Sequence, residues 1–188
     1  QAKWIDIYDF SIPLGVWIND ATILMIFVVS LVSFLVHLYS TSYMKNDSRY
    51  SRYFAFLGLF TFSMFGIVIA DNLFIIFMFW ELVGFSSYLL IGFWFEKTSA
   101  AYAAKKAFLV NRIGDIGMFL GMMTLFLYGG HTFNLIDLHN NAAYIDNGIL
   151  TLAGIMLFFG AIGKSAQVPL QVWLPDAMEG PTPVSALI

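Results

Sequence analysis

Long uninterrupted apolar blocks, rather than amphipathic stripes, dominate the sequence. Each block is long enough to cross about 30 Å of hydrocarbon as an α-helix, at about 1.5 Å per residue. The blocks run over residues 21–44, 53–70, 73–95, 107–128 and 148–174, and a further block starts after Pro183. This pattern predicts an all-α polytopic membrane protein with about five complete transmembrane helices and the start of a sixth. Pro169 and Pro175 interrupt the fifth block, so that helix is predicted to be discontinuous.

The first 19 residues mix polar and aromatic side chains and differ from the blocks that follow. Alternation around Ile5–Tyr8 and then Val16–Ile18 predicts a short β-hairpin at the membrane surface. Asp20 can accept hydrogen bonds from the first free amides of a helix, and we expect it to be the N-cap of the first span. The chain begins with Gln1 and ends inside an apolar run, so we expect it to be a fragment of a longer protein.

Composition agrees with a lipid-embedded chain and excludes several function classes. Of the 188 residues, 60% are hydrophobic and only 11% are charged, whereas a soluble domain is about a quarter charged. The absence of cysteine excludes iron–sulfur ligation, heme-thiolate chemistry and disulfides within this stretch. A net charge of −3 gives no reason to expect a nucleic-acid partner. No nucleotide-binding glycine loop or catalytic triad is visible, so no cofactor-binding or metal site is predicted.

The loop cations orient the predicted helices. All six lie on two alternate connections: Lys45, Arg49 and Arg52 between the first two helices, and Lys97, Lys105 and Lys106 between the third and fourth. The positive-inside rule places both connections on the cytoplasmic side or its equivalent. The N-terminal segment, the Asp71–Asn72 turn and the 129–147 connection are then on the opposite side.

Four charged residues remain inside the predicted spans: Glu81, Arg112, Asp115 and Lys164. A charge at mid-bilayer costs about 3 kcal/mol on insertion scales, so such residues usually mark ion pathways. Glu81 is expected near the midplane, with a neutral glutamic acid bonded to a neighbouring helix as the structural alternative. Lys164 lies between glycines and Pro169, where a broken helix could build an ion site, with snorkelling to an interface as its alternative.

Arg112 and Asp115 are three residues apart and share a helix face. They could form a self-neutralising structural pair or take part in proton transfer. Gly117 and Gly121 form a small-xxx-small face, which predicts close helix packing. His37, the only histidine within a span, is expected to cap its helix end rather than to relay protons, and a single imidazole does not support bis-histidine heme ligation.

Three stretches resemble the antiporter-like subunits of respiratory complex I (NADH:quinone oxidoreductase), most closely the distal subunit L or chain 5 type. They are DNLFIIFMFWELVGFSSYLLIGFWF (71–95), KAFLVNRIGDIGMFLG (106–121) and GAIGKSAQVPLQVWLPDAMEGPTPVSALI (160–188). The resemblance implies an antiporter-like bundle in which the Glu81 carboxylate pairs with the lysine of GKSAQ, Lys164. It also implicates Asp115 in the proton relay, with Arg112 beside it. Residues 1–56 would be the N-terminal segment, and 57–188 the start of a truncated proton-translocating domain.

The resemblance further implies a proton-translocating subunit whose relay is coupled to quinone reduction elsewhere in the complex. The chain itself would hold no redox centre, because NAD, FMN, iron–sulfur clusters and quinone would bind other subunits. Its partners would be other membrane subunits of complex I, the lipid bilayer and protons. We expect a bacterial inner membrane, with an organellar inner membrane as the alternative.

Three other functions are consistent with the same residues. The large subunit of a multi-subunit Na⁺/H⁺ antiporter and a membrane subunit of a membrane-bound hydrogenase are both homologous alternatives. In the third, the chain is a scaffold whose buried charges only assemble helices, and it would tolerate Lys164→Met.

Overall fold

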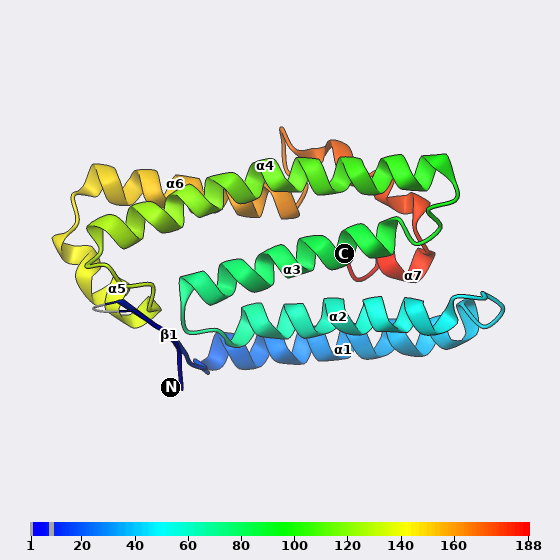
Figure 1. Ribbon diagram of the computed structural model, residues 1–188, viewed down its shortest axis with the longest axis horizontal. Coiled ribbons are helices and arrows are strands. Elements are labelled where there is room, and N and C mark those ends of the chain that lie inside the picture. Colours follow the sequence, from blue (N-terminus) through cyan, green and yellow to red (C-terminus); the bar gives the residue numbers. More distant parts are fainter. Residues whose placement is uncertain (1, 8–9) are drawn as a thin grey trace.

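The computed structural model describes residues 2–7 and 10–188 of the chain, which form a bundle of long helices with a β-hairpin at one end (Figure 1). The five long helices are α1 (Asp20–Tyr43), α2 (Tyr50–Ile69), α3 (Leu73–Ile91), α4 (Thr98–Tyr128) and α6 (Asn147–Lys164). The remaining elements are β1 (Ala2–Ile7), β2 (Phe10–Leu14), α5 (Leu135–Asn141), α7 (Thr182–Ser185) and the 3-10 turns η1 (Ala142–Tyr144), η2 (Gln171–Trp173) and η3 (Asp176–Glu179).

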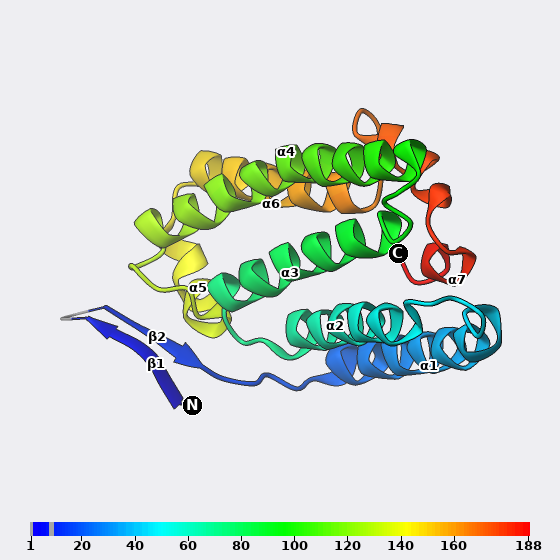
Figure 2. The ribbon, with the colours of Figure 1, turned by 45° about the vertical axis from the view of Figure 1, so that its right-hand side comes forward.

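The long helices are arranged in layers along the long axis of the molecule. Helix α1 packs on α2, α2 on α3, α3 on α4, and α4 along α6. Figure 2 shows α3 between the α1–α2 layer and the α4–α6 layer. All five long helices are apolar and long enough to cross a membrane, which confirms the predicted all-α polytopic fold with five complete spans.

The connections lie at two opposite ends of the bundle, as the cation pattern predicts. The α1–α2 and α3–α4 connections are at one end, together with α7, whereas β1 and α5 are at the other (Figure 1). At the cation-rich end the two connections are joined by the ion pair between Arg49 and Glu96, 2.8 Å. The indole N–H of Trp94 also donates to Asp47, at 3.0 Å. These contacts hold the ends of α1, α2, α3 and α4 together.

The N-terminal segment confirms a hairpin and the described part of its first predicted strand, but not the second predicted strand. β1 pairs with β2 in antiparallel orientation, so the second strand is Phe10–Leu14 and the prediction of Val16–Ile18 is wrong. The predicted strand Ile5–Tyr8 includes Tyr8, which is outside the described residues. The predicted helix cap is also one residue off. Asn19, not Asp20, accepts a hydrogen bond from the Thr22 amide at 2.8 Å, and Asp20 is the first residue of α1.

Helix α4 begins at Thr98, well before the predicted start at Ala107. The added turns are rich in alanine, the residue with the highest helix propensity. One face of them is buried, since Ala103, Ala104 and Ala107 pack against Trp173 and Ala177. Hydrophobicity alone missed this part of α4 because small side chains and Lys105 and Lys106 dilute the apolar signal.

Helix α6 ends at Lys164, so the prediction that the fifth block continues to Leu174 is wrong. Two hydrogen bonds close the end of the helix, from Gln167 to the Ile162 carbonyl at 3.0 Å and from Ala166 to the Gly163 carbonyl at 3.3 Å. This is a Schellman motif, in which Ala166 adopts a left-handed φ of 50°. The indole of Trp173 also donates to the Gly163 carbonyl, at 3.0 Å. The predicted discontinuity therefore lies directly after Lys164, where protein groups satisfy the freed backbone.

Candidate functional site

Glycines bring α4 and α6 close together at the level of the predicted charges. A Cβ added to Gly114 would lie only 3.1 Å from the Gly163 Cα atom. One added to Gly121 would lie 2.8 Å from the Ala153 carbonyl oxygen. Gly117 similarly faces Phe159, so the predicted small-residue face does pack closely. Because Gly114 precedes Asp115 and Gly163 precedes Lys164, the same approach sets these two charged residues opposite each other.

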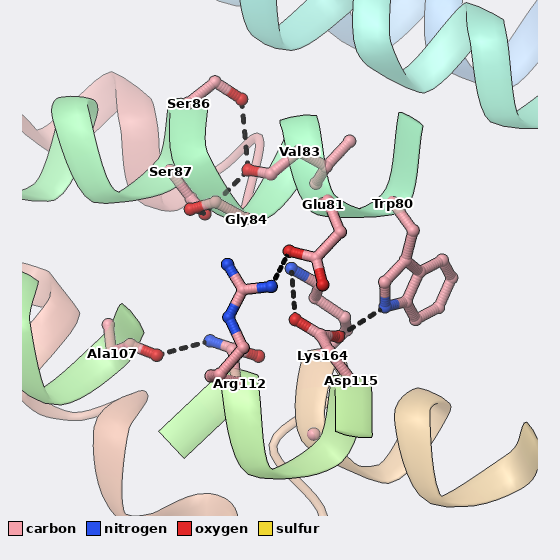
Figure 3. A network of polar contacts seen from close by, with 12 residues as sticks. Trp80, Glu81, Val83, Gly84, Ser86, Ser87, Ala107, Arg112, Asp115 and Lys164 are labelled. Atoms are coloured by element: carbon pink, nitrogen blue, oxygen red, sulfur yellow. Dashed lines mark hydrogen bonds and ion pairs between the residues drawn. The ribbon is translucent and has the colours of Figure 1, made fainter. Parts of the chain in front are cut away.

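The four charged residues predicted from the sequence meet in one cluster between α3, α4 and α6 (Figure 3). Arg112 of α4 forms an ion pair with Glu81 of α3. Lys164, at the end of α6, lies 3.9 Å from Asp115 of α4, measured from Nζ to Oδ2. Lys164 and Glu81 still interact electrostatically, but the ion-pair contact predicted between them is replaced by these two pairs. The alternative of a self-neutralising Arg112–Asp115 pair is likewise not observed among the described residues, because each residue pairs across helices.

Burial differs among the four side chains and separates their roles. The side chain of Asp115 is 3% exposed and that of Lys164 is 17% exposed, whereas Glu81 is 20% and Arg112 is 40% exposed. The guanidinium of Arg112 also lies over the Phe108 ring, 4.9 Å from its centroid. The Lys164–Asp115 pair is therefore the interior pair, and the Arg112–Glu81 pair is nearer the surface of the described bundle.

Trp80 is a site residue that was not predicted from the sequence. Its indole N–H donates to Asp115 Oδ1 at 2.8 Å (Figure 3), so Asp115 is held by Trp80 on one side and faces Lys164 on the other. A hydrogen bond to a charged group is about twice as strong as a neutral one. The available signal was its position next to Glu81 in a span, because an indole N–H inside a membrane needs an acceptor.

Gly84 is a second unpredicted contributor. The Nζ atom of Lys164 occupies the space where a Gly84 side chain would begin. The absence of a side chain at this position of α3 therefore lets the lysine cross from α6 to the α3 backbone. Lys164 Nζ is buried and has no hydrogen-bond partner among the described residues.

Asn111, the third unpredicted contributor, lies one helical turn before Asp115. It is 6% exposed, and its Nδ2 donates to the Ala107 carbonyl at 2.8 Å. Its Oδ1 has no partner among the described residues. The NRIGD stretch includes this residue, but a single asparagine in a span gave no signal of its own.

The predicted site residues thus lie together, and their chemistry suits proton movement. Two carboxylates and one lysine can each gain or lose a proton, whereas the arginine stays charged. His37 bonds through Nδ1 with the Ser33 carbonyl, 2.8 Å away on its own helix α1, and is not part of the cluster. Over residues 2–7 and 10–188 no group of three or more histidine, cysteine or acidic residues could hold a metal ion.

Comparison with known proteins finds relatives over nearly the whole chain. A family model for the N-terminus of chain 5 of NADH-ubiquinone oxidoreductase (complex I) matches residues 4–54. Relatives named NAD(P)H-quinone oxidoreductase subunit 5, chloroplastic, include those of Zygnema circumcarinatum, 46% identical, and Coffea arabica, 48% identical, each over 99% of this chain. The chain spans about a quarter of their length, 27% and 26% respectively. These chloroplast proteins are consistent with the organellar alternative for its membrane.

Solved structures of similar shape come from two other membrane complexes. A chain of the Mrp complex from a Dietzia species is 25% identical, with a TM-score of 0.83 over 93% of this chain and 21% of that one. A chain of an archaeal membrane-bound sulfane sulfur reductase shares the fold at 23% identity, with a TM-score of 0.80 over 92% of this chain and 35% of that one. A family model described as NADH:quinone oxidoreductase/Mrp antiporter, TM, matches residues 70–188. The two matches confirm the resemblance read from the motifs. Because the second model covers more than half of the chain, the chain belongs to the NADH:quinone oxidoreductase/Mrp antiporter transmembrane family.

Proposed function

We propose that the chain is the first part of a proton-translocating membrane subunit of an NADH:quinone oxidoreductase of the complex I type. The observation that carries the proposal is the cluster of two carboxylates, one arginine and one lysine between α3, α4 and α6, within apolar helices long enough to span a membrane. Charges at this depth are costly and are usually tied to ion movement. The relatives named as subunit 5 of a quinone oxidoreductase support the same assignment.

In this proposal Lys164 is the group that gains and releases the proton. Burial disfavours its charged form, whereas the carboxylates of Asp115 and Glu81 favour it. Arg112 keeps its charge at any relevant pH, so its ion pair holds Glu81 in place. Neutralising or withdrawing either carboxylate then favours loss of the lysine proton to the next group in the path.

The energy scale of this switch matches the work to be done. Moving one charge across a membrane potential of 100 mV takes about 2.3 kcal/mol. Two charges about 4 Å apart interact by about 4 kcal/mol at an effective dielectric constant of 20, and the Lys164–Asp115 distance is 3.9 Å. The Coulomb energy of this pair is therefore of the same order as the work of moving one proton against a potential of about 100 mV.

The proposal places all redox chemistry outside this chain. NAD, FMN, iron–sulfur clusters and quinone would be bound by other subunits, and the partners would be other membrane subunits of the complex together with lipid. The relatives' names, which refer to a numbered subunit of an oxidoreductase, support such an assembly. Those names read NAD(P)H and so include NADPH, and the test therefore uses both NADH and NADPH as electron donors.

The test uses the tagged full-length protein, purified in mild detergent from its native membrane and assayed for quinone reduction by NADH and by NADPH. Co-purifying activity is expected. In membrane vesicles, Glu81→Gln and Lys164→Met should then lower the number of protons moved per quinone reduced, whereas Lys106→Met should not. The control lysine also forms an ion pair, with Asp176 at 2.7 Å, but both side chains are 44% exposed. Unchanged stoichiometry in both site variants contradicts the relay and supports a scaffold role for the buried charges.

A second candidate is the large subunit of a multi-subunit Na⁺/H⁺ antiporter. The structural match to the Mrp complex, with a TM-score of 0.83, and the shared family model favour keeping it. An assembly without NADH or NADPH activity that exchanges Na⁺ for protons in vesicles would support this candidate and contradict the first.

A further inference from the structure

A cavity lies beside the charged cluster, on the side of the bundle that faces α2. Its volume is about 470 Å³, and it is lined by apolar side chains of α1 and α2, by Trp80 and Ser87 of α3, and by Asn111 and Lys164. A water molecule takes about 30 Å³ in the liquid, so the cavity can hold several. Most of its wall is apolar, so the few polar groups on it determine where water or an ammonium group can bind inside it.

Two of these polar groups are buried and lack hydrogen-bond partners among the described residues: the Oδ1 atom of Asn111 and the Nζ atom of Lys164. One is an acceptor and the other a donor. Buried polar groups are paired in the great majority of cases, and exceptions call for a physical explanation. Asn111 is only 6% exposed, and its Nδ2 already donates to a backbone carbonyl of its own helix. Its side-chain oxygen, Oδ1, is therefore the group available to the cavity.

Helical geometry sets Asn111 within reach of Lys164. Asn111 and Asp115 are four residues apart on α4 and so lie on one face, about 6 Å apart along the axis. The glycine contact between α4 and α6 lies between Asn111 and Asp115 along the α4 axis. A Cβ on Gly163 would lie 3.3 Å from the Gly114 Cα atom and 3.6 Å from the backbone carbonyl oxygen of Asn111. The lysine following Gly163 can therefore turn toward either end of this face.

We propose that Asn111 is a positioning residue. It provides a neutral hydrogen-bond acceptor for a second position of the Lys164 side chain in this cavity. In the observed position the ammonium lies by Asp115, 3.9 Å away. In the second position it donates to Asn111 Oδ1, directly or through one water molecule. The move takes the lysine away from the carboxylates, where burial favours release of its proton. This inference rests on the proposed proton relay, and it adds to that relay the residue that receives the lysine.

The charged groups that face Lys164 from the neighbouring helices are Glu81 on α3 and Arg112 and Asp115 on α4. Asn111 is a neutral amide on the same cavity wall as Lys164. An apolar residue there would remove the unpaired amide oxygen from the cavity wall. An aspartate there would keep an acceptor oxygen but add a charge, and would hold the lysine instead of releasing it.

The experiment compares Asn111→Leu, Asn111→Asp and the packing control Met122→Leu in the full-length protein within its native complex. Met122 is also on α4 and is 1% exposed, and Met-to-Leu exchanges conserve volume. Quinone reduction, proton uptake into vesicles and the pH profile of proton uptake are measured for each. Asn111→Leu is expected to slow proton uptake by about tenfold or more, the scale of one lost hydrogen bond to a charged group. It should also shift the pH profile, whereas Met122→Leu should change neither.

The remaining outcomes separate this inference from the proposed function. Wild-type proton uptake and an unchanged pH profile in Asn111→Leu would overturn the role of Asn111, provided that Lys164→Met lowers uptake in the same assay. Wild-type uptake in Lys164→Met would instead overturn the relay itself. If Asn111→Leu fails to assemble, the smaller Asn111→Val makes the same test. Asn111→Asp is expected to slow uptake with a pH profile shifted differently from that of the apolar variants, and a wild-type profile would contradict the need for a neutral acceptor.

Discussion

The hydrogen bond between Trp80 and Asp115 offers a direct test of how the interior pair works. Trp80→Phe keeps an aromatic ring on α3 but removes the indole N–H that donates to Asp115 Oδ1 at 2.8 Å. Asp115 is 3% exposed, so only water from the cavity beside Trp80 could replace the lost donor. We therefore expect this substitution to disturb Asp115, and through it Lys164, more than its small change in size suggests.

The expected magnitude follows from the type of bond. Hydrogen bonds to charged groups contribute about 1.5–3 kcal/mol, and about 1.4 kcal/mol corresponds to a factor of ten. The Trp80→Phe variant should therefore translocate protons about 10- to 150-fold more slowly if the Asp115 carboxylate controls the limiting step. The assay is proton uptake by vesicles that contain the assembled complex, with quinone reduction measured in parallel.

Trp94→Phe is the matched control for this prediction. The indole of Trp94 also donates to an aspartate, Asp47, at 3.0 Å, but at the cation-rich end of the bundle and outside the spans. It should lower stability slightly and leave proton uptake unchanged. Equal and wild-type uptake in both variants would refute the view that Asp115 is controlled through Trp80.

Three further predictions concern the packing and ends of the helices, each measured by thermal unfolding of the purified protein in detergent. Gly121→Ala should destabilise it by about 1–3 kcal/mol, because the new Cβ would meet α6 backbone at 2.8 Å, whereas Gly154→Ala, with open space around it, should be neutral or slightly stabilising. Ala166→Gly should stabilise by about 1 kcal/mol, because the left-handed φ of 50° suits glycine. The Trp94 indole and then the Arg49 amide hold the pKa of Asp47 below its ordinary value of 3.8. The stability that Asp47 adds is therefore present above that value and lost as the pH falls through the lowered pKa. The melting-temperature gap between the wild type and Asp47→Asn should shrink over that acidic range, and a pH-independent gap would contradict this.

Transmembrane spans were predictable because membrane length and hydropathy leave few alternatives. The positive-inside rule then ordered the connections, and the structure places them at the two expected ends. Helix ends were predicted less well, since they depend on local caps and tertiary contacts rather than on hydrophobicity. Asn19 replaced Asp20 as the cap of α1, and the start of α4 depends on buried alanines that carry no strong apolar signal.

The members of the charged cluster could be predicted, but their pairing could not. Any charge inside a span is conspicuous, so Glu81, Arg112, Asp115 and Lys164 were all found. Their partners depend on how far α6 approaches α4, and contacts of glycines on these two helices set that distance. The neutral contributors Trp80, Gly84 and Asn111 were missed for a related reason: an uncharged residue in a span becomes informative only when its neighbours are known.

With two ion pairs, the carboxylate that most affects the charge of Lys164 is a different one from that in a single Glu81–Lys164 pair. Arg112, which keeps its charge, occupies Glu81, so Asp115 is the carboxylate closest to the lysine. Lys164 is also the last residue of α6, where the negative end of the helix dipole favours a cation. Burial opposes these two effects, so the charge on the lysine is set by a balance of opposing interactions with groups on three helices. A small movement of α4 relative to α6 would change the distance to Asp115 without moving the helix end, and would tip that balance.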